Sequence, residues 1–327
     1  MSWIDPIAEA VTRRADPMVQ WHQEGTTCYR LFHGAVEGIP GLAIDRYGPI
    51  ALAQTWRAPL EEDALAALRD WAAQQELLLV WNDRARRGDV TYRHDVAVPE
   101  AVVGQELGLS YDVTPRHAGI DPLLFLDFRA ARRWIRQNAK DKTVLNLFAY
   151  TCGIGVAASK GEAQQVLNVD FATRNLEVGR TNAQLNGIGK RQFKVLCEDA
   201  ICILRQFSGL GVKGKAAKRR FTRRPPQQFD IVVLDPPRLA KSPFGKVDVV
   251  GDYQSLLKPA LLCAKEGGVV LATNNVANID PDDWLGAVTR CAAKAGRPIR
   301  DVHWLMPEAD FPSPDGKPPL KMVVLSL

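Results

Sequence analysis

The sequence lacks several features that would place it in other protein classes. Its six cysteines form no C-x-x-C pair, which argues against a disulfide framework and favours free thiols in a reducing compartment. No window approaches the roughly 18 consecutive apolar residues of a membrane span. Residues 1–17 carry acids and no apolar core, so we expect neither a membrane anchor nor a signal peptide. These absences predict a cytoplasmic protein with no membrane partner and no bound metal.

Excess charge is also small. The 327 residues are 46% hydrophobic and 24% charged, and the net charge is +5, all ordinary for a soluble globular chain. The length suits one large domain or two modest ones with a sizeable core. Net charge by itself therefore identifies no nucleic-acid partner.

Glycine and proline punctuation divides the chain near residue 105. Before that point, strand-like runs joined by turn residues surround one helical segment at 61–75, and a short helix precedes them. The expected strands are CYRLFHG, GLAIDRYG, PIALAQTWR and LLLVWND. We predict a smaller N-terminal α+β domain over 1–105, on the RNA or substrate side, and a second domain over 106–327.

In the second domain, apolar strands alternate with segments long enough to form helices. The strands are expected near 143–148, 165–170, 192–196, 229–235 and 267–273. The runs PIRDVHWLM and LKMVVLSL would close the sheet as an antiparallel pair. This alternation predicts an α/β fold with a Rossmann-like, doubly wound parallel sheet.

Acids follow two of these strands. Asp170 ends the second strand, where a carboxylate can accept hydrogen bonds from both hydroxyls of a nucleoside ribose. Asp235 ends a later strand and precedes Pro236 and Pro237, which restrict the backbone and would form a stiff wall beside a cofactor. The two features together indicate a class I S-adenosylmethionine methyltransferase.

The glycine turn after the first of these strands must be weighed against a dinucleotide site. Gly153 and Gly155 follow a strand and open a helix, but Ala158 stands where G-x-G-x-x-G has its third glycine. A pyrophosphate needs the full loop and a helix N-terminus aimed at it. S-adenosylmethionine has no phosphate, so we favour a methyltransferase over an NAD enzyme.

These motifs together resemble those of the bacterial 23S rRNA large-subunit methyltransferases, a family with a cytosine-C5 branch and a guanine-N7 branch. The similarity runs from about Cys28 to the C-terminus and includes GIDPLLFLDFRAARRW, VLNLFAYTCGIGVAA, NLEVGRTNAQLNG and VVLDPPR. The chain lacks the PUA domain usual in the cytosine branch. It differs from both branches in a basic insert, and in Cys152 where glycine is usual.

The resemblance implies S-adenosyl-L-methionine as cofactor and large-subunit rRNA as partner. The cofactor-binding residues that it implies are Asn146, Phe148, Tyr150, Thr151, Gly153, Asp170, Phe171, Asp199 and Asp235. Asn146 and the turn 149–155 would line the methionine end, Phe171 would pack on the adenine, and Asp199 would accept from its amino group. The residues alone allow Asn146 to cap a strand and Asp199 to cap a helix. Arg129 and Asp127 would border the site, or form a surface ion pair.

The basic insert, Gly209–Gln228, contains seven Lys or Arg residues and no acid. It enters a strand at the end opposite the expected active site, so a solvated loop would explain it. A flexible loop could still reach round to bind phosphates, and its contribution would depend strongly on salt. The expected RNA-binding residues are Lys213, Lys215, Lys218, Arg219, Arg220, Arg223, Arg224, Arg238 and Asn275.

The target atom is predicted from residues that are absent. Methylation of cytosine C5 needs a thiolate that first adds to C6, and neither 235–238 nor 273–275 contains cysteine. Exocyclic amine methylation commonly uses an aromatic residue where Arg238 stands. Guanine N7 has a free lone pair and needs only alignment, and its branch resembles this chain in the Asn274-Asn275 pair. We therefore expect guanine-N7 methylation of 23S rRNA. The expected catalytic residues are Asp235, Pro236, Pro237 and Asn274. The alternatives are a cytosine-C5 enzyme and a non-catalytic RNA-binding assembly factor.

Overall fold

The computed structural model describes residues 3–85, 91–93, 100–115, 122–213, 217–242 and 244–327, which form two compact units. The first unit contains Met1–Arg129 and Pro307–Gly316, and the second contains Ala130–Met306 and Lys317–Leu327. This division differs from the predicted boundary at residue 105. The chain after that point stays with the first unit because the backbone N–H of Leu107 donates to Thr26 Oγ1 and that of Gly108 donates to the carbonyl of Gly25.

The first unit is built on a mixed sheet with strand order β1-β2-β3-β4-β5. Its strands are β1 (Cys28–His33), β2 (Leu42–Tyr47), β3 (Ile50–Thr55), β4 (Leu78–Asp83) and β5 (Thr91–Arg93), with a separate hairpin of β6 (Val103–Glu106) and β7 (Leu109–Asp112). Its helices are α1 (Asp5–Arg13), α2 (Ala15–Gln23), α3 (Gly34–Glu37), α4 (Glu62–Gln74) and the 3₁₀ turn η1 (Leu126–Phe128). The expected strands and the helix at 61–75 are therefore present, and the short N-terminal helix is a pair.

A buried ion cluster joins the ends of the first unit. The Arg129 guanidinium is 1% exposed and donates to Asp310 Oδ1 at 2.5 Å and to Glu308 Oε2 at 2.8 Å. It also donates to the carbonyl of Cys28 at 2.9 Å. Arg129 is thus a buried ion pair within the first unit and not a surface one. Its place at the border of the cofactor site stays a prediction.

The second unit contains the predicted alternation of strands and helices. Its strands are β8 (Thr143–Leu147), β9 (Gln165–Asp170), β10 (Phe193–Cys197), β11 (Phe229–Leu234), β12 (Leu239–Ser242), β13 (Gly245–Asp248), β14 (Ala264–Asn274), β15 (Asp301–Trp304) and β16 (Lys321–Ser326). Its helices are α5 (Arg129–Asn138), α6 (Gly153–Lys160), α7 (Thr173–Leu185), α8 (Ala200–Phe207), α9 (Gln254–Cys263) and α10 (Pro281–Lys294).

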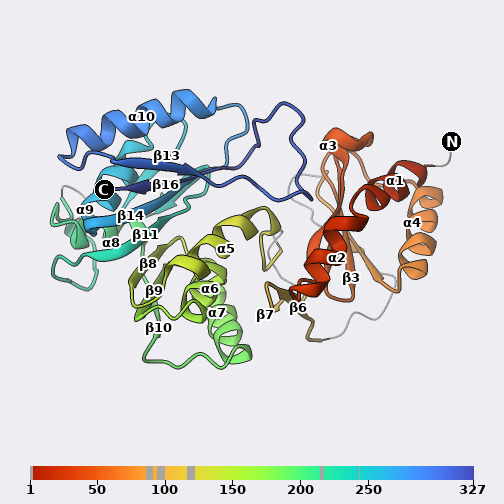
Figure 1. Cartoon of the computed structure of the whole chain (residues 1–327), viewed down its shortest axis with the longest axis horizontal. Coiled ribbons are helices and arrows are strands. Elements are labelled where there is room, and N and C mark those ends of the chain that lie inside the picture. The colour runs from red at the N-terminus through yellow and green to blue at the C-terminus, as the bar shows by residue number, and fades with distance from the viewer. Residues whose placement is uncertain (1–2, 86–90, 94–99, 116–121, 214–216, 243) are drawn as a thin grey trace. The chain divides into compact units, whose positions relative to one another are not determined.

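Seven strands form one sheet in the order β10-β9-β8-β11-β14-β16-β15, with five parallel strands and an antiparallel β16 between β14 and β15 (Figure 1). The predicted α/β class is confirmed, as is the antiparallel pair that closes the sheet. Helices α6 and α7 pack on one another, and α8, α9 and α10 form a second packed group. The order of strands reverses at β8, so β9 and β11 lie on its two sides. Ligands of such sheets bind at this point of reversal.

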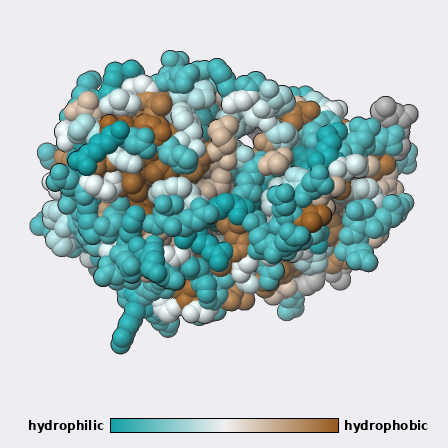
Figure 2. Space-filling model, viewed as in Figure 1, coloured by the Kyte–Doolittle hydropathy of each residue, from teal (hydrophilic) through white to brown (hydrophobic). Residues whose placement is uncertain are grey.

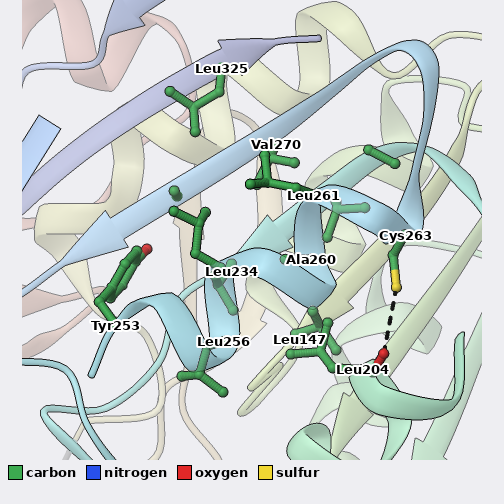
Figure 3. Packing of buried hydrophobic residues seen from close by; sticks show 14 of the residues in the cluster. Leu147, Leu204, Leu234, Tyr253, Leu256, Ala260, Leu261, Cys263, Val270 and Leu325 are labelled. Atoms are coloured by element: carbon green, nitrogen blue, oxygen red, sulfur yellow. Dashed lines mark hydrogen bonds between the residues drawn. The ribbon is translucent and has the colours of Figure 1, made fainter. Parts of the chain in front are cut away.

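The core of the second unit lies between the sheet and α8–α10. Figure 3 shows Leu256, Ala260 and Leu261 of α9 in the buried cluster that also contains Leu234 and Val270 of the sheet. On the face seen in Figure 2, hydrophobic side chains gather below α10 on a surface that is otherwise largely hydrophilic. None of the helices that the structure describes is long and apolar enough to cross a membrane.

Candidate functional site

The sheet brings the predicted acids to one edge. Strand β8 pairs in parallel with β9 on one side and with β11 on the other, so the three carboxyl ends lie together. Asp170 stands at the end of β9, and Asp235 follows the end of β11. The turn after β8 lies between them, which is the arrangement expected from the sequence.

The turn that follows β8 is held in an uncommon conformation. Phe148, Tyr150 and Cys152 have φ of 56°, 49° and 61°, the left-handed region that non-glycine residues enter at a cost of about 1–3 kcal/mol each. The N–H of Ala149 donates to the carbonyl of Val169 at 2.9 Å. The N–H of Tyr150 donates to Asp170 Oδ2, also at 2.9 Å. Strand β9 therefore fixes the strained turn.

Asp170 organises the loops on both sides of its strand. Its Oδ1 accepts from the N–H of Ala172 at 2.9 Å, while Oδ2 accepts from Tyr150. Burial raises the pKa of this carboxyl above its ordinary value, although these hydrogen bonds act in the opposite direction. A carboxylate offers about four acceptor positions. The N–H groups of Tyr150 and Ala172 and the side chain of Asn175 already use part of this capacity. The ribose contact of Asp170 stays a prediction.

One face of α7 supports the turn from beneath. Asn175, Gly179 and Asn182 are spaced i, i+4 and i+7, which places them on the same side of the helix. Asn175 hydrogen-bonds Asp170, and Asn182 Nδ2 donates to the carbonyl of Thr151 at 3.0 Å. Two asparagines and a glycine at helical spacing are visible in the sequence, but that spacing alone does not indicate contact with the turn.

Cys152 packs against this face of α7. It is fully buried and is the N-cap residue of α6, where it makes no side-chain capping bond. Burial, with a further contribution from the Asp170 charge, raises the pKa of its thiol far above the ordinary value. The cysteine is therefore a packing residue. The first N–H groups of α6 have no acceptor within the helix, and they fit the carboxylate at the methionine end of the cofactor.

Asn146 lies in an amide chain that crosses three strands. Its Nδ2 donates to Asn168 Oδ1 at 2.9 Å, and Asn168 Nδ2 donates to the carbonyl of Lys194 at 3.1 Å. A Cβ at Gly155 would overlap the same Asn168 oxygen. The second glycine of the turn thus makes room for Asn168, which the sequence did not indicate.

The two residues expected at the adenine differ in their surroundings. Phe171 follows Asp170 with a side chain 69% exposed, which leaves an aromatic face that an adenine could cover. Asp199 is 9% exposed, and its Oδ1 accepts from the N–H of Cys202 at 2.9 Å. It caps α8, the alternative that the residues allowed. Its Oδ2 could accept from the adenine amino group, and that contact stays a prediction.

Asp235 is positioned by the neighbouring strand. The Thr273 hydroxyl on β14 donates to Asp235 Oδ1. The buried phenol of Tyr253 lies beside both residues, and burial, followed by the Asp235 charge, raises its pKa well above the ordinary value. Pro236 is buried and Pro237 is exposed. Thr273 and Tyr253 were not identified from the sequence, because hydroxyl residues in apolar strands and helices give no distinctive pattern.

The Asn274-Asn275 pair divides between the interior and the surface. Asn274 is 1% exposed, and its Oδ1 accepts from the N–H of Val276 at 2.9 Å. Its Nδ2 is buried without a hydrogen-bond partner. A buried donor without a partner costs about 1–3 kcal/mol, so this amide is suited to a ligand at the strand ends. Asn275 and Arg238 are exposed.

The basic insert is described except for residues 214–216, so the predicted contact at Lys215 lies outside the described residues. The side chains of Lys213, Lys218, Arg219, Arg220 and Arg223 are exposed, and that of Arg224 is half-buried. Within the described ranges, no group of three or more His, Cys, Asp or Glu side chains could hold a metal ion.

A cavity of about 360 Å³ lies between α9 and α10, away from the turn after β8. Tyr253, Trp284 and Cys291 line it together with the exposed cations Arg290 and Lys294. Tyr253 is the side chain through which this cavity adjoins the environment of Asp235.

A family model described as S-adenosylmethionine-dependent methyltransferase matches residues 48–325. Among curated proteins, the ribosomal RNA large subunit methyltransferase I of Aeromonas salmonicida is 29% identical over 312 residues, covering 91% of this chain and 72% of the relative. The Escherichia coli (strain SMS-3-5 / SECEC) protein of the same name is 26% identical over 318 residues, covering 92% and 75%.

Solved structures share the fold. One protein assigned as a methyltransferase and solved with SAH superimposes with a TM-score of 0.79 at 24% identity, covering 99% of this chain and 80% of that one. The SAM-dependent methyltransferase from Agrobacterium tumefaciens gives a TM-score of 0.62 at 18% identity, covering 88% and 87%.

Proposed function

Because the chain belongs to the S-adenosylmethionine-dependent methyltransferase family, we propose that it methylates a base of large-subunit ribosomal RNA in the cytoplasm. The observation that carries the proposal is the placement of Asp170, the turn 148–152 and Asp235 at the carboxyl ends of three adjacent parallel strands. The relatives named as large-subunit rRNA methyltransferases support the choice of RNA. Membership of a methyltransferase family favours an enzyme over the alternative of a non-catalytic RNA-binding assembly factor.

Bound S-adenosylmethionine supplies an electrophilic methyl group on a sulfonium centre. In this proposal Asp170 holds the ribose, Phe171 covers the adenine, and the N-terminus of α6 faces the methionine carboxylate. Their common function is to fix the cofactor without a general base, so that alignment with the target atom supplies most of the acceleration. The expected contacts of Asn146, Phe148, Tyr150, Thr151, Gly153 and Asp199 remain part of this proposal.

The target base would lie against the segment that follows β11. Asp235, oriented by Thr273, accepts hydrogen bonds from the base or from the cofactor amine, while Pro236 and Pro237 keep the wall rigid. The buried Nδ2 of Asn274 would donate to the base edge. Arg238, Asn275 and the exposed cations of the insert would contact the RNA backbone, and the first unit would add further RNA contacts.

For the target atom, the named relatives support the cytosine-C5 alternative better than the guanine-N7 expectation. A specific observation keeps guanine N7 as a second candidate. Cytosine C5 needs a thiolate beside the base, but five of the six cysteines are buried, and exposed Cys197 ends β10 rather than β11 or β14. Burial raises the pKa of the Cys202 thiol to about 11 and that of Cys263 to about 12, which keeps both protonated.

Methyl transfer from labelled S-adenosylmethionine to protein-free large-subunit rRNA and to whole large subunits tests the proposal. Labelled RNA supports it, and no incorporation into either substrate would refute it. RNA that contains 5-fluorocytidine then separates the two atoms. A stable protein–RNA adduct that disappears on mutation of one cysteine assigns cytosine C5. Methylated RNA without an adduct excludes cytosine C5, and 7-methylguanosine among the digested nucleosides then assigns guanine N7.

A further inference from the structure

The basic insert accounts for the positive charge of the whole protein. It contributes seven cations and no acid, while the net charge of the chain is only +5. The remainder of the chain therefore has a net charge of −2. The insert is therefore a local concentration of cations in a chain whose remainder has no net positive charge, and such a concentration is what a polyanion would bind.

The two ends of the insert are fastened to α8. The N–H of Gly211 donates to the carbonyl of Arg205 at 2.8 Å, and Arg205 Nε donates to the carbonyl of Gly211 at 2.9 Å. On the exit side, the N–H of Arg224 donates to Gln206 Oε1 at 2.8 Å. Gln206 is 7% exposed in an otherwise largely apolar helix. Its burial is explained by this bond, since a buried amide without partners would be costly.

The middle of the insert rests on the hairpin that follows the Asp235 segment. The rings of Phe221 and Phe244 meet edge to face, with centroids 5.6 Å apart. Phe244 lies at the tip of the hairpin β12–β13, between the paired residues Ser242 and Gly245. At the hairpin base, the N–H of Val249 donates to the carbonyl of Arg238. The hairpin thus connects the insert to the residues after Pro237.

Phe221 is the only aromatic residue in the basic insert, and it is half-buried while Arg219, Arg220 and Arg223 around it are exposed. A loop that served only as a solvated linker would gain nothing from a phenylalanine docked on another element. The contact instead fixes the backbone so that the cations point to solvent. A fixed array of cations loses less conformational entropy on binding a polyanion than a mobile one.

We propose that residues 217–224, anchored by Phe221 on Phe244 and by Arg224 on Gln206, form a fixed phosphate-binding surface for the RNA strand next to the target nucleotide. The inference rests on the proposed function for its choice of partner. The ligand chemistry is the phosphodiester backbone, which is read without regard to base sequence. Base recognition stays with the strand ends.

The first test measures the salt dependence of binding to a protein-free large-subunit rRNA transcript between about 50 and 200 mM salt. The variant R219Q/R220Q/R223Q removes three exposed insert cations. The matched control, K190Q/R191Q/K194Q, removes three exposed cations at the amino end of β10. We expect the insert variant to lower the slope of log affinity against log salt by about 0.7–0.9 for each phosphate that is no longer bound, and the control to leave it unchanged. Equal slopes in wild type and insert variant would overturn the proposal.

The second test examines the anchor. Phe221→Ala keeps every charge but removes the ring contact with Phe244. The fraction of molecules in which the insert is detached from the hairpin should then rise by about two- to tenfold, the range for one aromatic pair. Trypsin, which cuts after Lys and Arg, should then cleave within the insert faster by the same factor, and RNA affinity should fall. Cleavage as fast in the wild type as in the variant would contradict the anchored surface.

These readouts contain no methyl transfer, so the two proposals can fail separately. If the wild type binds RNA with an insert-dependent salt slope but methylates no rRNA, the proposed function fails and the phosphate-binding surface stands. If rRNA is methylated while the insert variant keeps the full slope, the surface is refuted and the function stands.

Discussion

The thiol of Cys152 occupies the space that a side chain at position 179 would need. A Cβ at Gly179 would lie 2.5 Å from Cys152 Sγ. Cys152 itself has φ of 61°, where glycine is the usual residue. Gly179 on α7 therefore accommodates the cysteine that stands in the cofactor turn, and the two positions form one packing unit.

Gly179→Ala should lower the free energy of unfolding by about 1–3 kcal/mol, because the added methyl group overpacks against the sulfur. The double variant C152G/G179A should recover most of that stability, since it removes the sulfur and relaxes the left-handed residue. Chemical denaturation of both single variants and the double variant measures the coupling. The control is Gly189→Ala, where a Cβ meets nothing within 4 Å. Strictly additive effects would show that the two residues do not interact.

Asp170→Ala should weaken S-adenosylmethionine binding by about 2–4 kcal/mol, because the variant loses charged hydrogen bonds to the ribose and the acceptor that fixes Tyr150. Titration calorimetry measures the affinity, and thermal unfolding confirms that the variant is folded. Glu162→Ala, a change at an exposed carboxylate, serves as the control. A folded Asp170→Ala protein with wild-type affinity would disprove the ribose assignment.

Thr273→Val should lower kcat and raise the KM for S-adenosylmethionine by a smaller factor, because Asp235 loses the hydroxyl that orients it. A displaced group at a reacting centre can cost about 10²-fold, and we expect a loss of about ten- to a hundredfold. Steady-state methylation assays give both constants. The control is Thr289→Val, which removes a hydroxyl on α10 that donates to the carbonyl of Leu285. Equal kcat in the two variants would argue that Asp235 needs no orientation.

Asn274→Asp keeps an oxygen for the N–H of Val276 and removes the buried amide donor. If that donor hydrogen-bonds the base, its loss should raise the free-energy barrier to methyl transfer by about 1–3 kcal/mol, which lowers the rate roughly five- to 150-fold. Asn278→Asp, an exposed change in the same loop, should have no such effect. Unfolding curves for both proteins separate an effect on chemistry from an effect on stability. Unchanged turnover in Asn274→Asp would exclude Asn274 from base recognition.

The strand ends could be predicted from the sequence, and the packing behind them could not. Asp170 and Asp235 follow apolar runs, and chain connectivity alone brings such ends to one edge of a parallel sheet. Cys152 and Gly179 meet only because α6 packs on α7, and no local pattern records that packing. The division of the chain was missed for a similar reason, since Asp310 returns to Arg129 from far along the sequence.

The same distinction holds within the site. Asn146 was expected in the site from the family resemblance, with strand capping as the alternative, but its bond to Asn168 requires the pairing of β8 with β9. Thr273 became visible only through the pairing of β14 with β11. Sequence therefore indicated which loops meet at the strand ends, while the neighbours that orient each side chain came from the structure.

The most direct test of the account is mass spectrometric mapping of large-subunit rRNA from a strain that lacks this protein. We expect one base methylation to disappear, to return with the wild-type gene, and to stay absent with Asp235→Ala expressed at the same level. The mass and retention of the modified nucleoside would assign the atom. A complete, unchanged set of rRNA methylations in the deletion strain would contradict the proposed function.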